Sequence, residues 1–348
     1  MTTLESDRII GNITSDTPGP TMVFFGGIHG NEPAGVLALE QVLRVFGRGE
    51  VRLKCGSLIA MRGNPPALMR KERFLQHDLN RLWRRNRMAG ILENPRAGRS
   101  SEEEQLAILH KGVHEILAGY DPPFYFFDLH TTSSRSLPFI TINDSLINRR
   151  FSVHIPVPVI LGIEEYLDGP LLSYINELGY LALGFESGQH DDPQAISNAE
   201  DFIWLALSAA GAIESQPGLE ARYKRLREAA FGDQHFYEIY YRHELPEQHA
   251  FQMEEGFWSF QALPKGTLLA TEAGLPVEMT RKGILFMPLY QKQGEEGFFL
   301  IRRTPRWALR LSARLRKWNL HRALSWLPGV RWEDKTKDRL VVDLRVAR

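Results

Sequence analysis

The stretch Val23-Phe-Phe-Gly-Gly-Ile-His29-Gly-Asn-Glu32-Pro33-Ala-Gly35 decides the predicted fold of this chain. An apolar run ends in two glycines, a turn carries His29 and Glu32, and Pro33 begins a helix. Open α/β sheets bind their ligands at the carboxyl ends of the strands. The pattern therefore predicts an imidazole and a carboxylate on one turn at that edge of a sheet.

Strand and helix patterns alternate between residues 20 and 230, which indicates a mainly parallel sheet flanked by helices. The predicted strands are 21–27, 57–61, 124–130, 138–142, 158–163 and 181–186. The predicted helices are 33–46, 102–118, 169–178 and 193–210, and Ser100 or Ser101 is expected to cap the second of them. We therefore expect residues 1–230 to form an α/β domain.

The pattern of apolar and turn-forming residues changes after about residue 230. Short apolar runs punctuated by glycine and proline predict strands at 236–242, 257–261, 267–270, 284–288 and 298–303. Helical periodicity returns at 307–327 as a basic amphipathic helix, and a last strand is expected at 340–346. Residues 231–348 are thus predicted to form a smaller, β-rich C-terminal domain.

Charge is unevenly distributed along the chain. The 42 basic and 42 acidic residues balance overall, but residues 302–348 hold 14 lysines and arginines against four acidic residues. This basic segment indicates either an arm for an anionic partner or a tail that docks on its own acidic body. It contains no recognisable nucleic-acid-binding module, so we expect no nucleic-acid partner.

Composition excludes several other classes of protein. The chain has 348 residues and 43% hydrophobic residues, so a large core is expected. Cys55 is the single cysteine, which excludes a disulfide framework and a cysteine-rich metal site. The N-terminus lacks the pattern of a signal peptide, and no apolar run approaches the ~18 residues of a membrane span. We expect a cytoplasmic protein, and homo-oligomer formation is left open.

A second strand also ends in a histidine. The run Phe124-Tyr-Phe-Phe-Asp128-Leu-His130 places His130 at the same predicted sheet edge as His29, with Asp128 one pleat earlier on the same face. A catalytic zinc takes three protein ligands and a water. Taken alone, His29 is better explained as a structural turn histidine. Together with Glu32 and His130 it favours a metal site, with zinc and other divalent ions both open.

Two further segments carry groups suited to binding and catalysis. Arg73 and Arg81 flank Asp78 and Asn80, and arginine forks recognise carboxylates well, although a solvated basic surface explains this segment equally. The last predicted strand of the α/β region ends in Glu186. A partly desolvated carboxylate there is suited to act as a general base, while an exposed strand-end glutamate is the simpler alternative.

Five short motifs occur in order along the chain. They are His29-Gly-Asn-Glu32, Gly63-Asn-Pro-Pro-Ala-Leu68, Asp78-Leu-Asn80-Arg81, Asp128-Leu-His130-Thr131 and the late strand-end Glu186. In this order they resemble the succinylglutamate desuccinylase/aspartoacylase family, which belongs with zinc carboxypeptidases of the carboxypeptidase A type. The resemblance spans about residues 20–190 and implies a carboxypeptidase-like fold with a β-rich C-terminal domain.

The resemblance also implies roles for individual residues. One zinc ion per chain would be bound by His29, Glu32 and His130, and Asp78 would support a ligand histidine. Asn80 and Arg81 would hold a substrate carboxylate, Arg73 would polarise the scissile carbonyl, and Glu186 would be the base. The implied activity is hydrolysis of the linear amide bond of an N-acyl amino acid, with the small β domain excluding long peptides.

This sequence departs from the aspartoacylase pattern at two places. A further arginine expected shortly before the catalytic glutamate is absent from Leu172-Ser-Tyr-Ile-Asn-Glu177, where Arg149 or Arg150 are candidate substitutes. Thr131-Thr132 after His130 also differs. The acyl and amino-acid specificity is therefore open. A zinc carboxypeptidase for short peptides and a non-catalytic binding protein on the same fold remain as alternatives.

Overall fold

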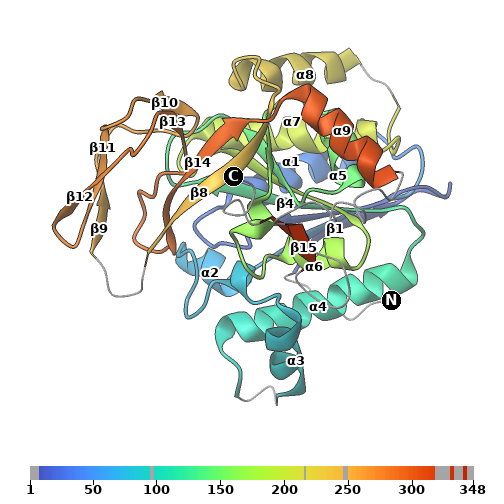
Figure 1. Cartoon of the computed structure of the whole chain (residues 1–348). Helices are drawn as coiled ribbons and strands as arrows, with labels where there is room; N and C mark the ends of the chain where they lie inside the picture. Colours follow the sequence, from blue (N-terminus) through green and yellow to red (C-terminus); the bar gives the residue numbers. More distant parts are fainter. Residues whose placement is uncertain are drawn as a thin grey trace. The chain divides into compact units, whose positions relative to one another are not determined.

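The computed structural model describes residues 8–94, 98–214, 217–245, 250–317, 330–332 and 340–342. The chain divides into two units, Met1–Arg303 and Thr304–Arg348. In its described residues the second unit consists of helix α9 (Arg306–Lys317) and an antiparallel pair, β15 (Val330–Trp332) and β16 (Leu340–Val342). The first unit carries the main sheet, and every residue considered as a functional candidate lies in it (Figure 1).

Four parallel strands form the part of the main sheet that positions the candidate site. They lie in the order β3 (Ser57–Arg62), β2 (Thr21–Gly26), β4 (Phe124–Thr132) and β7 (Leu181–Gln189). These strands are buried along almost their whole length, as apolar strands are when helices cover both faces of a sheet. Phe25 and Phe126 lie on one face and Phe24 and Phe127 on the other, because successive side chains alternate.

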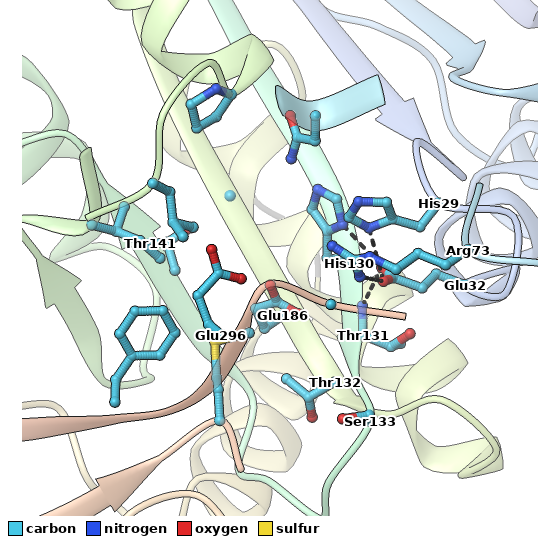
Figure 2. A pocket seen from close by; sticks show the side chains of 18 of the residues that line it. His29, Glu32, Arg73, His130, Thr131, Thr132, Ser133, Thr141, Glu186 and Glu296 are labelled. Atoms are coloured by element: carbon cyan, nitrogen blue, oxygen red, sulfur yellow. Dashed lines mark hydrogen bonds and ion pairs between the residues drawn. The ribbon is translucent and has the colours of Figure 1, made fainter. Parts of the chain in front are cut away.

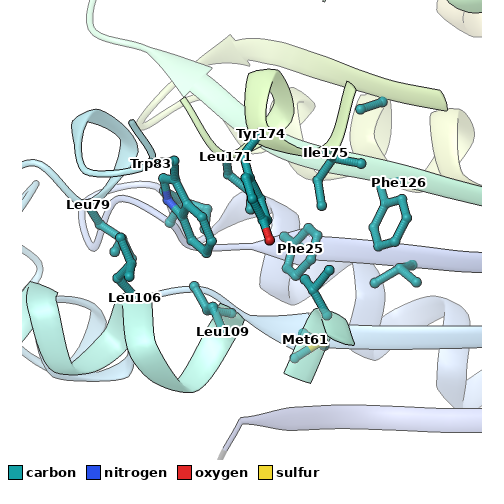
Figure 3. Packing of buried hydrophobic residues seen from close by; sticks show 14 of the residues in the cluster. Phe25, Met61, Leu79, Trp83, Leu106, Leu109, Phe126, Leu171, Tyr174 and Ile175 are labelled. Carbon is teal, nitrogen blue, oxygen red and sulfur yellow. The ribbon is translucent and has the colours of Figure 1, made fainter. Parts of the chain in front are cut away.

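Helices cover both faces of these strands (Figure 1). On the Phe25 side lie α3 (Arg85–Glu93), α4 (Ser101–Gly119) and α6 (Leu171–Glu177). Figure 3 shows this packing, in which Phe25, Met61 and Phe126 of the sheet meet Leu106, Leu109, Leu171, Tyr174 and Ile175 of the helices. On the other side lie α1 (Ala34–Gly47), α5 (Leu146–Ser152) and α7 (Pro193–Ala209), with α8 (Pro217–Ala229) packed on α7.

The main sheet continues beyond β7 with strands of both directions. Next in order are β5 (Phe139–Ile142), β6 (Val159–Leu161), β8 (Phe236–Glu244), β14 (Glu296–Arg303), β13 (Gly283–Phe286) and β10 (Gln261–Leu263), while β1 (Ile9–Thr14) forms the opposite edge. A smaller antiparallel sheet contains β12 (Leu275–Glu278), β11 (Leu268–Glu272) and β9 (Phe251–Met253). The predicted mixed α/β fold with a C-terminal β-rich region is confirmed.

The domain boundary expected near residue 230 stays a prediction. Strand β8 pairs in parallel with β6, so the main sheet runs across this position, and the antiparallel pairing of the C-terminal strands begins between β8 and β14. Because β14 and β13 extend the same sheet, the segment that joins them is brought to the cavity described below.

Most long elements agree with their predicted ranges. The Ser100 hydroxyl accepts from the Glu103 backbone N–H, and the Glu103 carboxylate accepts from the Ser100 N–H, which confirms the predicted cap of α4. Of the helix predicted at 307–327 and the strand at 340–346, residues 318–327 and 343–346 lie outside the described part of the chain. Predicted strand 257–261 is wrong, because β10 begins only at Gln261.

Several shorter elements have no counterpart in the sequence analysis, among them β1, β9, β12, α3, α5, α8 and α2 (Pro65–Arg70). Edge strand β1 is only half-buried and pairs along one side, so its residues carry little hydrophobic signal. Among the described helices, none combines the length and apolarity needed to cross a membrane.

Candidate functional site

The turn after β2 is held by close backbone packing. A Cβ atom at Gly30 would lie 2.1 Å from the carbonyl carbon of Ala67 in α2, so only glycine fits here. The Gly30 N–H also donates to the Arg73 carbonyl at 3.1 Å. The turn that carries His29 and Glu32 is therefore fixed against both α2 and the segment that contains Arg73.

The Glu32 carboxylate lies between two histidines (Figure 2). Its Oε1 is 2.9 Å from His29 Nδ1, and its Oε2 is 2.9 Å from His130 Nδ1. The Thr131 backbone N–H donates to the same Oε2 at 3.0 Å. One ligand atom from each of His29, Glu32 and His130 lies within 4.8 Å of the others, and all three residues are buried.

The far nitrogen of each histidine meets a different carboxylate. His29 Nε2 is 3.1 Å from Asp78 Oδ1, and His130 Nε2 is 2.7 Å from Asp128 Oδ2. Carboxylates behind histidine ligands fix the orientation of the ring and increase its basicity. Two imidazole nitrogens backed in this way, together with one carboxylate oxygen, form a donor set that suits zinc. The residues present therefore fit a divalent metal ion.

Opposite charges control proton binding within this group. Burial alone would raise the pKa of Glu32, but His29 and His130 hold it well below its ordinary value. Burial would lower the pKa of His130, whereas Asp128 and Glu32 raise it well above the ordinary value. Burial likewise opposes ionisation of Asp78, yet Arg73 and His29 keep its pKa well below the usual range. The carboxylates of Glu32 and Asp78 are thus ionised over the ordinary pH range.

Arg73 lies beside these residues and is held by Asp78. Its Nε and Nη2 donate to Asp78 Oδ2 at 3.2 and 2.9 Å, and its Nη1 is 3.5 Å from Glu32 Oε1. Asp78 therefore joins His29 to Arg73. The loop before Asp78 is held by the buried carboxylate of Glu102, which accepts from the N–H groups of residues 75–77.

Asn80 and Arg81 lie further along the same cavity. The Asn80 side-chain oxygen accepts from the Leu171 N–H at 2.9 Å, which ties this segment to α6. Arg81 Nη2 donates to both carboxylate oxygens of Glu296, at 3.3 and 3.2 Å. The guanidinium group expected to meet a substrate carboxylate is thus paired with a carboxylate of the protein.

Glu186 projects from β7 beside His130, its register partner on β4. Its side chain is buried, and Oε2 has no hydrogen-bond partner among the described residues. Burial raises the pKa of Glu186 to about 8, and the nearby charges of Glu32 and Asp128 act in the same direction. An unpartnered oxygen on a carboxyl group with a raised pKa suits a group that accepts and returns a proton.

One cavity contains nearly all of the residues expected from the sequence. His29, Glu32, Arg73, Asn80, Arg81, His130 and Glu186 line it. Asp78 does not line the cavity but contacts His29 and Arg73, as a supporting residue should. The suggested substitutes Arg149 and Arg150 are wrong for this position. Arg149 pairs with Asp144, Arg150 is exposed, and neither lines the cavity.

Three residues that matter here were not expected as site residues from the sequence. Glu102 was expected only as the first residue of a helix, yet its carboxylate accepts backbone hydrogen bonds from the loop between Arg73 and Asp78. His190 follows the strand that carries Glu186, lines the cavity and has its Nδ1 2.7 Å from Thr131 Oγ1. Glu296 is more than 200 residues from its partner Arg81 and belongs to no motif, so no local signal could identify it.

Comparison with known proteins places this geometry in a family. Residues 18–189 match the family described as the succinylglutamate desuccinylase/aspartoacylase catalytic domain. This chain belongs to that family. A succinylglutamate desuccinylase from Pseudomonas fluorescens is 37% identical over 111 residues, which are 29% of this chain and 32% of that protein. One from Pseudomonas paraeruginosa is 33% identical over 115 residues, 32% of this chain and 31% of that protein. These alignments span about a third of each curated relative.

Solved structures of the family share the fold over a longer range. A succinylglutamate desuccinylase/aspartoacylase from Rhodobacter sphaeroides has a TM-score of 0.60 at 18% identity, covering 83% of this chain and 87% of that one. The product-bound ectoine utilization protein EutE from Ruegeria pomeroyi has a TM-score of 0.61 at 18% identity, covering 84% and 88%. The family fold therefore includes the β-rich region as well as the catalytic domain.

Proposed function

We propose that this protein is a zinc-dependent hydrolase that cleaves the linear amide bond of an N-acyl amino acid. The observation that carries the proposal is the meeting of His29, Glu32 and His130 within 4.8 Å, in the same cavity as the unpartnered carboxyl oxygen of Glu186. The desuccinylases among its relatives cleave such bonds, as their name states. A cytoplasmic location stays a prediction.

His29, Glu32 and His130 would hold the metal ion, one per chain. A zinc ion bound there supplies Lewis acidity, lowering the pKa of a bound water and polarising a carbonyl group. Asp78 and Asp128 orient the two imidazole rings through their far nitrogens, so that both Nδ1 atoms face Glu32. The chain thus presents its donor atoms before any ion arrives.

Glu186 acts as the general base and acid of the proposed reaction. In its ionised form it removes a proton from the attacking water, and it later gives that proton to the leaving amine. Its burial matters because a carboxyl group with a raised pKa is a stronger base than an exposed one. The unpartnered Oε2 is the atom available for this proton.

Arg73 stabilises the negative charge that develops on the carbonyl oxygen. Its guanidinium group is held by two donations to Asp78 and stays beside Glu32, so its position is set before the substrate binds. A preorganised cation of this kind lowers the barrier because it needs little rearrangement during the reaction. Asn80 and Arg81 then contact the part of the substrate that lies further along the cavity.

The test is to load the full chain with zinc and measure amine release from N-succinyl-glutamate, N-acetyl-aspartate, N-acetyl-leucine and a short peptide. We expect hydrolysis of at least one N-acyl amino acid, abolished by a chelator and restored by added zinc. Preferential cleavage of the peptide would identify a carboxypeptidase instead. Stoichiometric zinc with no amine release from any compound would overturn the proposal and favour a binding protein.

A further inference from the structure

Among the residues that the structure describes, the cavity offers a substrate no guanidinium group that is free of a protein carboxylate. Two arginines line it, Arg73 and Arg81. The first is paired with Asp78 and lies 3.5 Å from Glu32, and the second is paired with Glu296. Each carboxylate on a substrate would therefore have to displace a carboxylate of the protein from its partner, so every additional carboxylate weakens binding further.

The pairing of Arg81 with Glu296 is protected from solvent. The two side chains are only 13% and 11% exposed, so water screens this ion pair less than it screens a surface pair. A second cation, Arg242, has its Nη1 3.9 Å from Glu296 Oε1, but its Nη2 is already paired with Glu244 Oε2 at 2.8 Å. If Glu296 remains in place, a substrate carboxylate at Arg81 meets a like charge as well as a cation. The net attraction for an anion at this point is therefore small.

The lining around Glu296 is otherwise mostly apolar. We call the lining residues contributed by positions 287–299 the C-terminal wall: Met287, Leu289, Gln291, Gly294, Glu296 and Phe299. Figure 2 shows Glu296 and Thr141 across the cavity from His29 and Glu32, with Glu186 between the two sides. Ile142, Leu167 and Leu172 add further apolar surface. Such a lining favours an aliphatic group over a charged one.

The segment before β7 supplies no cation either. From residues 172–177 the cavity receives Leu172, and Gly184 lies next to it on β7. A Cβ atom at Gly184 would lie 2.3 Å from Thr141 Oγ1 and 3.3 Å from Leu172 Cδ1, so these side chains close directly over the strand. The segment in which the family resemblance suggests an additional arginine thus contributes a leucine to the cavity.

We infer that this cavity selects an amide that carries at most one carboxylate, whose group against the C-terminal wall is uncharged and aliphatic, and that Glu296 sets this preference by masking Arg81. The inference rests on the proposed amide hydrolysis, but it concerns binding and can be measured without turnover. Dicarboxylate compounds such as N-acetyl-aspartate are disfavoured because their second carboxylate finds no free cation. N-acetyl-leucine has the matching charge and an aliphatic side chain.

The binding test uses zinc-loaded Glu186→Gln protein, in which hydrolysis is suppressed. Calorimetry is expected to show N-acetyl-leucine binding at least tenfold more tightly than N-acetyl-aspartate, a difference of about 1.4 kcal/mol. Adding Glu296→Gln removes the masking charge, so the N-acetyl-aspartate dissociation constant should fall about tenfold while that of N-acetyl-leucine changes less than threefold. Glu295→Gln is the matched control, because this neighbouring carboxylate is 68% exposed and 3.9 Å from Arg81.

Three outcomes decide the matter. Loss of the tenfold preference in the Glu296 variant, with the preference retained in the Glu295 control, supports the inference. Tighter binding of N-acetyl-aspartate by the protein with Glu296 intact, or a ratio that Glu296→Gln leaves unchanged, overturns it. Should the preference hold while the protein with Glu186 intact releases amine from none of the compounds tested above, the cavity inference stands and the proposed hydrolysis fails. If Glu296→Gln lowers the melting temperature, Glu296→Ala with the same two ligands provides the second variant.

Discussion

The metal-binding end of the cavity and the C-terminal wall are built from the chain in different ways. His29, Glu32 and His130 come from the ends of two adjacent parallel strands and the turn after one of them. The C-terminal wall comes from β14 and from the connection between β13 and β14, more than 150 residues later. The first end is fixed by adjacent parallel strands, whereas the wall depends also on a segment that connects two antiparallel strands. Reaction chemistry and substrate selection are thus placed on separate parts of the chain.

This difference has a consequence for mutation. Residues at the metal-binding end share partners, since Glu32 contacts both histidines and Asp78 contacts both His29 and Arg73. A change there disturbs several groups at once, and effects should be strongly non-additive. Wall residues act on the substrate, so their substitution should alter which amide is cleaved more than whether one is cleaved.

Loss of a proposed metal ligand should have the largest effect. In His130→Ala one of three donors is removed and the charge of Glu32 loses a partner, so we expect less than a tenth of an equivalent of zinc and no measurable hydrolysis. Metal content per chain by elemental analysis is the measurement. His190→Ala, which removes another histidine of the same cavity, should retain a full equivalent. Full zinc occupancy in His130→Ala would show that the ligand set is wrong.

Removal of the proposed base should be the next largest effect. Glu186→Gln keeps the size of the side chain but cannot accept the proton, so kcat should fall by roughly 10²- to 10⁴-fold while zinc content stays at one equivalent. Glu164→Gln is the control, because Glu164 is another carboxyl group whose pKa burial raises, to about 7, but it does not line the cavity. Equal activity in both variants would remove Glu186 from the reaction.

A smaller effect is expected from the residue behind His29. Asp78→Asn removes the charge that orients His29 and holds Arg73, and changes of this kind typically lower metal affinity or activity about 10- to 100-fold. Competition with a chromogenic chelator measures the zinc dissociation constant. Exposed Asp16→Asn should leave that constant unchanged. An unaltered constant in Asp78→Asn, together with unaltered kcat/KM, would mean that the contact is only structural.

The same contrast explains what the sequence could predict. His29, Glu32, His130 and Glu186 each follow an apolar strand, and strands of one direction end at one sheet edge, so local pattern was enough to bring them together. The partner of Arg81 could not be found in this way. Glu296 reaches it only because β14 joins β8 in the main sheet, a pairing between distant segments that no local spacing encodes. Glu102 was missed since its role depends on a loop that folds back onto α4.

Edge strand β1 and the short helices show that local sequence pattern also fails to predict some elements of the fold. Their residues are partly exposed and contribute little periodic signal, while β2, β4 and β7 are apolar along most of their length. Elements that position the candidate metal ligands are therefore the ones that sequence predicts best. Strands β13 and β14 were also expected, at 284–288 and 298–303, but the long-range pairing that brings the C-terminal wall to the cavity was not, which is why specificity required the structure.

The last prediction concerns the pH dependence of the reaction and distinguishes titration of Glu186 from titration of His130. Glu186 must be ionised to accept a proton, and burial raises its pKa to about 8. A divalent cation beside it favours the carboxylate, so in the loaded enzyme the midpoint should lie below pH 8. Below that midpoint log(kcat/KM) should fall by about one per pH unit. The Glu164→Gln control should keep this acid limb, whereas the residual activity of Glu186→Gln should lack it.

His130 could produce a similar acid limb by another route, because Asp128 and Glu32 raise its pKa and a ligand histidine must lose its proton before it binds a metal ion. The two causes respond differently to zinc. If loss of metal limits the rate, the midpoint should move to lower pH as the zinc concentration rises. If Glu186 limits it, the midpoint should stay fixed once zinc saturates the site. A midpoint that follows zinc concentration, or an acid limb that persists in Glu186→Gln, would assign the limb to metal binding rather than to the base.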